Sequence, residues 1–161
     1  MKKITYVLSG FILVALIFHS CKKDKIKGCM DLTSINFNSD AEEDDGTCEY
    51  GGTGGNTTIV AYAVHHADTI INGDSLGYMD TAYVKFNAIE SPGLLASNYD
   101  LVIPGDSGEN HIHLQGLKKG KYFILMTGWD IDIGKRVIGG IPYVLTESAG
   151  EVDLKVPVTE D

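Results

Sequence analysis

Several residue types are scarce in this 161-residue chain, and each scarcity excludes some classes of function. There are one tryptophan and three cysteines, and thirteen Lys and Arg residues face twenty-two Asp and Glu residues. The net charge of −9 makes nucleic acid and anionic lipid headgroups poor partners, because an acidic surface repels both. Calcium and other cations are better matched to it.

The chain also lacks a phosphate-binding loop. The glycines at 51–55 do not lead into Gly-Lys-Ser/Thr and a helix, the arrangement that cradles nucleotide phosphates. Asp130 and Asp132 would share one face of a strand, but two carboxylates without a located partner do not define a glycosidase. We therefore expect a protein without enzymatic activity.

The start of the chain has the pattern of an export signal. Basic residues come first, an apolar stretch then runs to Phe18, and Ser20 precedes Cys21. The stretch is shorter than the roughly 20 residues that cross a bilayer, which disfavours a membrane-spanning helix, and ordinary secretion requires no cysteine at the cut. We expect residues 1–20 to be removed and Cys21 to be lipidated, with more than one acyl chain giving stable membrane anchoring.

Cysteine usage fits an exported protein. Once Cys21 is assigned to lipid, Cys29 and Cys48 remain as a pair, for which a disulfide is the default in an oxidising compartment and zinc the weaker alternative. Removal of the signal would take two lysines and no acid, so the net charge would become about −11. The Lys-rich start after Cys21 lacks an acidic run. This favours the periplasmic face of the outer membrane over the cell surface.

The remaining chain divides into four parts by composition. We expect a lipidated tether at 21–27, a cysteine-bounded acidic segment at 28–50, a flexible Gly-rich linker at 51–56 and one domain at 57–161.

The domain has the pattern of an all-β protein. Its apolar residues alternate with period two, as they do in strands with one buried face. The expected buried sets are Val60, Tyr62 and Val64; Ala82, Val84 and Phe86; Ile112 and Leu114; Tyr122, Ile124 and Met126; and Val152, Leu154, Val156 and Val158. About seven such strands predict an antiparallel β-sandwich. Pro142 and Pro157 each lack a ladder donor, so we expect them on edge strands or at irregularities.

Residues 28–50 resemble a short acidic module of exported proteins in Bacteroidota-type bacteria. They have its Gly-Cys-x-Asp start, its Asn-aromatic-Asn centre at 36–38 and its Asp-Asp-Gly-Thr-Cys end at 44–48. The resemblance implies an extracytoplasmic location and a Cys29–Cys48 bridge. It implies no catalytic function.

The same module contains oxygen ligands at a spacing suited to calcium. Asn36, Asn38 and Asp40 fall at i, i+2 and i+4, and the shell would be completed by Asp31, Asp44 and Asp45. The segment departs from an EF-hand loop, which has Gly at the position of Ala41 and Glu at that of Thr47. The alternative is a solvated, disulfide-stapled spacer.

A second resemblance lies in the main domain. Residues 116–122, Gly-Leu-Lys-Lys-Gly-Lys-Tyr, are similar to a passage of transthyretin-like and carboxypeptidase-regulatory-like sandwiches. The resemblance implies that Leu117 fills the core, Gly120 takes the turn and Tyr122 begins an inward-facing strand. One enzymatic relative of that fold ends in Tyr-Arg-Gly-Ser, whereas this chain ends in Pro-Val-Thr-Glu-Asp, so its activity does not carry over.

Histidines form a second candidate metal site. His111 and His113 point to the same face of an alternating strand, so both can bind one metal ion. One of His65 and His66, with His66 as our choice, would complete a three-histidine site, with Asp106 or Glu109 nearby. The alternative is that these histidines are simply solvated on a sheet face.

Trp129, the sole tryptophan, is either a sugar-stacking platform or a core anchor. Together these patterns predict a lipid-anchored, non-enzymatic β-sandwich with a binding or structural accessory role toward a protein or glycan. Metal binding by the histidines and glycan binding at Trp129 are the alternatives.

Overall fold

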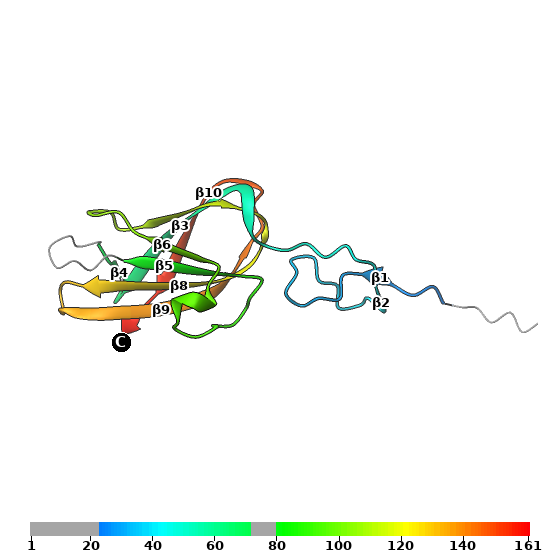
Figure 1. Ribbon diagram of the computed structural model, residues 1–161, viewed down its shortest axis with the longest axis horizontal. Coiled ribbons are helices and arrows are strands. Elements are labelled where there is room, and N and C mark those ends of the chain that lie inside the picture. The colour runs from blue at the N-terminus through cyan, green and yellow to red at the C-terminus, as the bar shows by residue number, and fades with distance from the viewer. Residues whose placement is uncertain (1–22, 72–79) are drawn as a thin grey trace, which may run out of the picture.

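The computed structural model describes residues 23–71 and 80–161, which form an almost entirely β-structure (Figure 1). The predicted export signal and Cys21 lie outside the described residues. Over the described ranges, no helix has the length and apolarity needed to cross a membrane. The elements are β1 (Lys27–Gly28), β2 (Glu43–Asp44), β3 (Thr53–His65), β4 (Asp68–Thr69), β5 (Thr81–Phe86), η2 (Ala96–Asn98), β6 (Leu101–Pro104), β7 (Ile112–Leu117), β8 (Gly120–Asp130), β9 (Lys135–Leu145), β10 (Ala149–Pro157) and β11 (Thr159–Glu160).

Two sheets form the predicted sandwich. In the first, β3 pairs with β10, β4 and β7, and in the second the order is β11-β9-β8-β5-β6. Apart from β4 and β11, which are only two residues long, the two sheets contain seven strands, so the expectation of about seven strands is confirmed. The pairing is antiparallel except that β10 runs parallel to β3, because the chain leaves the second sheet after β9 and crosses to the first. Pro142 and Pro157 lie where their strands have a free edge, as expected.

The core lies between the two sheets and draws on both. It includes most of the expected buried sets from β5, β7, β8 and β10, with Tyr122, Leu114 and Val84 fully buried. The prediction for β3 was wrong by one residue. Ile59, Ala61 and Ala63 face the core, whereas Tyr62 and Val64 are only half-buried.

The predicted linker at 51–56 is also corrected. β3 already begins at Thr53, and a Cβ atom on Gly55 would lie 2.0 Å from the carbonyl oxygen of Leu117. Gly51 donates its N–H to Asn87 Oδ1 over 2.7 Å, and Gly52 donates to the Tyr122 hydroxyl over 3.0 Å. Gly55 is needed because β3 and β7 approach closely there, and the hydrogen bonds of Gly51 and Gly52 hold the segment to the domain.

The close approach extends to Gly120, which the second resemblance assigned to a turn. Gly120 is the first residue of β8, and a Cβ atom there would lie 2.2 Å from Gly51 Cα. Leu117 and Tyr122 are fully buried, as that resemblance implied.

The acidic module lies beyond one end of the sandwich (Figure 1). Cys29 and Cys48 form the expected disulfide, with Cα atoms 4.8 Å apart. The ammonium group of Lys121 in β8 donates a hydrogen bond to the carbonyl oxygen of Leu32, with 2.6 Å between nitrogen and oxygen. This contact joins the module to the sandwich in addition to the backbone at Gly51.

Candidate functional site

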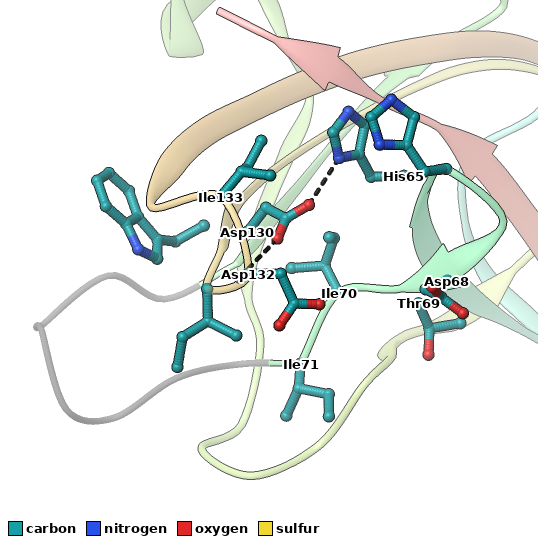
Figure 2. Close-up of a pocket in the computed structure, with 11 residues that line it drawn as sticks. His65, Asp68, Thr69, Ile70, Ile71, Asp130, Asp132 and Ile133 are labelled. Atoms are coloured by element: carbon teal, nitrogen blue, oxygen red, sulfur yellow. Dashed lines mark hydrogen bonds and ion pairs between the residues drawn. The ribbon is translucent and has the colours of Figure 1, made fainter.

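A hollow opens at the end of the sandwich opposite the acidic module. β4 lies at that end in Figure 1, and β1 and β2 lie beyond the other. The hollow has a volume of about 260 Å³ and is lined by two segments, from His65 to Ile71 and from Trp129 to Ile133. They belong to the end of β3 with β4 and to the end of β8 with its turn (Figure 2).

Backbone strain marks the turn between β3 and β4. His65 pairs with Asp68, and the two residues between them have positive φ, 48° at His66 and 75° at Ala67. Left-handed backbone costs a residue with a Cβ atom about 1–2 kcal/mol, and turns of this shape favour Asn-Gly. Strain of this kind concentrates at functional sites, which makes His66 on the wall of the hollow notable.

His65 and Asp130 form a buried pair beside the hollow. His65 Nδ1 lies 2.6 Å from Asp130 Oδ2, and the His65 residue is 3% exposed (Figure 2). The hydrogen bond from His65 holds the pKa of Asp130 below its ordinary value, and the backbone N–H of Asp132 bonding to Oδ1 acts in the same direction. The pair ties the last residue of β3 to the last residue of β8.

The other nitrogen of His65 faces the C-terminal strand. Nε2 is buried, forms no hydrogen bond with another described residue, and lies 3.6 Å from Glu160 Oε2. The pKa of Glu160 is lowered, first by a hydrogen bond from its own backbone N–H and then by its proximity to His65 and Lys135. His65 therefore stands between β8 and β11, with a carboxylate on each side.

An Asp-His pair orients an imidazole as a general base requires, but a nucleophile must lie within hydrogen-bond reach of it. Among the described residues, no hydroxyl or thiol bonds to His65. The sequence has one Gly-x-Ser-x-Gly match, at 73–77, outside the described residues. The nucleophile elbow joins a strand to a helix, whereas here the chain continues into strand β5 at Thr81.

Asp80 is a further buried acid near the hollow. It is 4% exposed, and burial raises its pKa to about 6, although a hydrogen bond from the Trp129 backbone opposes that rise. A Cβ atom on Gly128 would lie 2.5 Å from Asp80 Oδ1, so the glycine leaves the room that this carboxyl group fills.

The rim of the hollow combines apolar and acidic side chains. Ile71, Ile131 and Ile133 are 58%, 68% and 40% exposed, which is unusual for large aliphatic residues gathered at one place. The exposed carboxylates of Asp68 and Asp132 make no ion pair or side-chain hydrogen bond with other described residues. Trp129, one of the sequence candidates, is half-buried and lines the hollow.

The predicted three-histidine site does not form. His111 and His113 do share a face of the first sheet, and they line a second hollow of about 250 Å³ together with Asp106 and Glu109. His66 lines the first hollow instead, beyond the turn that ends β3. Over residues 23–71 and 80–161, no group of three or more His, Cys, Asp or Glu side chains is arranged to hold a metal ion.

The aspartates among the calcium candidates form no group of three arranged to hold a metal ion in the described module, and each candidate has a hydrogen bond that shapes the module. Asp31 accepts hydrogen bonds from Thr33 and Tyr50, and the amide of Asn36 bonds to the backbone of Thr47 and Glu49. The side chains of Asn38, Asp44 and Asp45 accept bonds from backbone N–H groups two residues ahead. Asp40 bonds to Asn38 through its backbone N–H, so the spacing reflects turns within the described module.

Sequence reasoning missed the His65–Asp130 pair, although a signal for it exists. Asp130 follows Tyr122, Ile124 and Met126 at even spacing, so the alternation directs it inward. His65 is in phase with the core residues of β3 once that phase is corrected. Two ionisable residues at inward positions require a partner, because an unpaired buried charge is costly.

No protein-family model, curated protein or solved structure matches this chain.

Proposed function

We propose that this chain is a lipid-anchored, non-enzymatic protein of the cell envelope whose binding site is the hollow at the end of the sandwich. Lipid on Cys21 would anchor it in the outer membrane, with the periplasmic face favoured. The proposal rests on one observation: the acidic module and the hollow lie at opposite ends of the sandwich (Figure 1). A tether attached at the module end leaves the hollow directed away from the membrane.

The contacts between the module and the sandwich support this arrangement. Gly51 bonds to Asn87 and Lys121 bonds to Leu32, so the module behaves as a spacer fixed to the domain. A spacer of this kind raises the hollow above the lipid without leaving it free to turn back toward the surface.

The occupant that the rim fits best is a basic segment of a partner protein with aliphatic side chains. Asp68 and Asp132 provide carboxylates that are free of other described partners, and the chain has a net charge of −9. Ile71 and Ile131 provide exposed apolar surface beside them. Unlike charges steer such a partner to the rim, and apolar contact in the centre supplies the affinity.

Site-directed photo-crosslinking in cells tests the proposal. A photo-crosslinking residue in place of Ile131 should yield a discrete adduct with a protein, and Asp68→Asn with Asp132→Asn should weaken it. Leu94 is the matched control, because it is 66% exposed against 68% for Ile131 and lies in the segment between β5 and η2. Equal adducts at both positions, or none at Ile131, would contradict the assignment of this end.

Glycan binding is the second candidate, because Trp129 lines the hollow beside the free carboxylate of Asp132. An aromatic face stacks on a sugar ring while carboxylates accept bonds from its hydroxyl groups. A glycan array should then give hits that Trp129→Ala removes. An array without such a hit leaves the protein partner as the occupant.

A further inference from the structure

The second hollow contains two histidines whose ring nitrogens meet. His111 Nε2 lies 3.0 Å from His113 Nε2, because the two side chains project from the same face of the first sheet at the start of β7. His113 is exposed and His111 is half-buried, with the ring of Tyr62 in β3 centred 5.6 Å from that of His111. The pair is thus held on one side and open to solvent on the other.

The neighbours of His111 determine where its proton lies. Asn110 donates through Nδ2 to Thr69 Oγ1 over 3.2 Å and directs its Oδ1 at His111 Nδ1 over 3.0 Å. Because an amide oxygen only accepts hydrogen bonds, Nδ1 is the donor. A neutral His111 therefore has its lone pair on Nε2, facing His113.

We propose that His111 and His113 form a two-histidine site for a first-row transition-metal ion, with copper(II) as the best fit. At metal–nitrogen distances of about 2.0–2.1 Å, nitrogens 3.0 Å apart subtend an angle of about 95° at the ion. That angle suits neighbouring positions in a tetragonal copper(II) or nickel(II) site better than the tetrahedral geometry of zinc. Copper(II) binds nitrogen ligands most tightly of the divalent series.

Binding requires one rearrangement of protons and no redox step. In the free protein the Nε2–H of neutral His113 donates to the Nε2 lone pair of His111. When the ion binds, His113 carries its proton on Nδ1 instead, so both Nε2 lone pairs face the metal and no proton is released from neutral rings. Both rings lose this capacity when they are protonated, so affinity falls in acid.

The surroundings supply the outer contacts that metal-binding histidines have. Asn110 accepts the bond from His111 Nδ1, and Glu109 Oε2 lies 3.7 Å from the same nitrogen. An acceptor on the nitrogen that does not bind the metal fixes the orientation of the ring. Asp106 and Gln115 also line the hollow, and water fills the remaining positions of the ion. The site is separate from the first hollow, so it does not rest on the function proposed above.

Copper(II) titration of the purified protein, followed by calorimetry and by electron paramagnetic resonance, tests the proposal. We expect one equivalent to bind with nitrogen hyperfine coupling from two imidazoles. His111→Ala and His113→Ala should each weaken binding at least about ten-fold and remove coupling to one nitrogen, and Asn110→Ala should weaken it roughly ten-fold with the coupling retained. His66→Ala is the matched control and should leave the spectrum unchanged, because His66 is exposed outside this hollow.

Two results would overturn the proposal. One is the absence of stoichiometric copper(II) binding at neutral pH. The other is a spectrum that persists in the His111→Ala, His113→Ala double variant, which would show that copper binds elsewhere on the chain. Circular dichroism of each variant establishes that the fold is retained, as expected for substitutions at positions with partly or fully exposed side chains.

Discussion

Asp130 Oδ2 and His65 Nδ1 lie 2.6 Å apart, although 65 positions separate the two residues in the chain. Their bond joins the ends of one strand from each sheet at the wall of the first hollow. It therefore sets both the stability of that end and the shape of the proposed binding surface.

Asp130→Asn should destabilise the fold by about 2 kcal/mol, because it replaces a charge-assisted hydrogen bond to a buried histidine with a weaker one. Urea unfolding at pH 7 measures the loss. Asp132→Asn is the control, since its exposed carboxylate has no such bond, and it should change stability by less than about 0.5 kcal/mol.

The effect of Asp130 should depend on pH in a defined direction. The folded pKa of this carboxyl group is lowered, so its stabilisation is fully present above the unfolded value of about 4 and is lost as pH falls through the folded value. The difference between wild type and Asp130→Asn should therefore shrink below pH 4. If the stability difference stays constant down to pH 2, the negative charge of Asp130 is not its cause.

Asp80 should behave in the opposite way. Burial raises its folded pKa to about 6, so its ionisation destabilises the folded state progressively between about pH 4 and 6 and fully above that range. Asp80→Asn has nearly the same shape and cannot ionise. It should raise the Tm at pH 7.5 and leave it unchanged at pH 4, whereas equal shifts at both values would point to packing.

Gly120→Ala should loosen the junction between the module and the sandwich. The added Cβ atom would meet the backbone of Gly51 at 2.2 and 2.4 Å, a clash that only backbone movement relieves, at a cost of about 1–3 kcal/mol. Gly52→Ala is the neighbouring control, with nothing within 4 Å of its Cβ position. Equal urea midpoints for the two variants would show that close contact at Gly51 does not matter.

Loss of the disulfide should open the module and leave the sandwich folded. Cys29 and Cys48 close a segment of 19 positions, and cross-links of that span contribute about 3 kcal/mol. In a Cys29→Ser, Cys48→Ser variant, limited proteolysis should cut within residues 28–50 and spare the β-domain. Protease resistance equal to that of wild type would mean that contacts such as Lys121 to Leu32 hold the module without the bridge.

Sequence alternation anticipated most of the sandwich, because one face of each strand is apolar and the other polar. It failed on β3, where Ile59 to Val64 are apolar on both faces and the period no longer shows which side is buried. The glycines at 51–55 resemble a linker in composition. Their actual role depends on Leu117 and Tyr122, partners distant in sequence that the local pattern does not reveal.

The candidate sites show the same division between local and distant information. His111 and His113 share a face because period two is a local rule, and that prediction holds. The position of His66 depends on how a strained turn ends β3, and the partners of the acidic side chains in residues 28–50 depend on turns that spacing alone does not distinguish from a cation shell.

The most direct test of the account is the mass of the N-terminal peptide of the protein isolated from membranes of its native host. We predict a chain that begins at Cys21 with several acyl groups, and a Cys21→Ala variant that loses both the lipid and this cleavage. An N-terminus without acyl groups, or recovery of the wild-type protein in the soluble fraction, would contradict lipid anchoring.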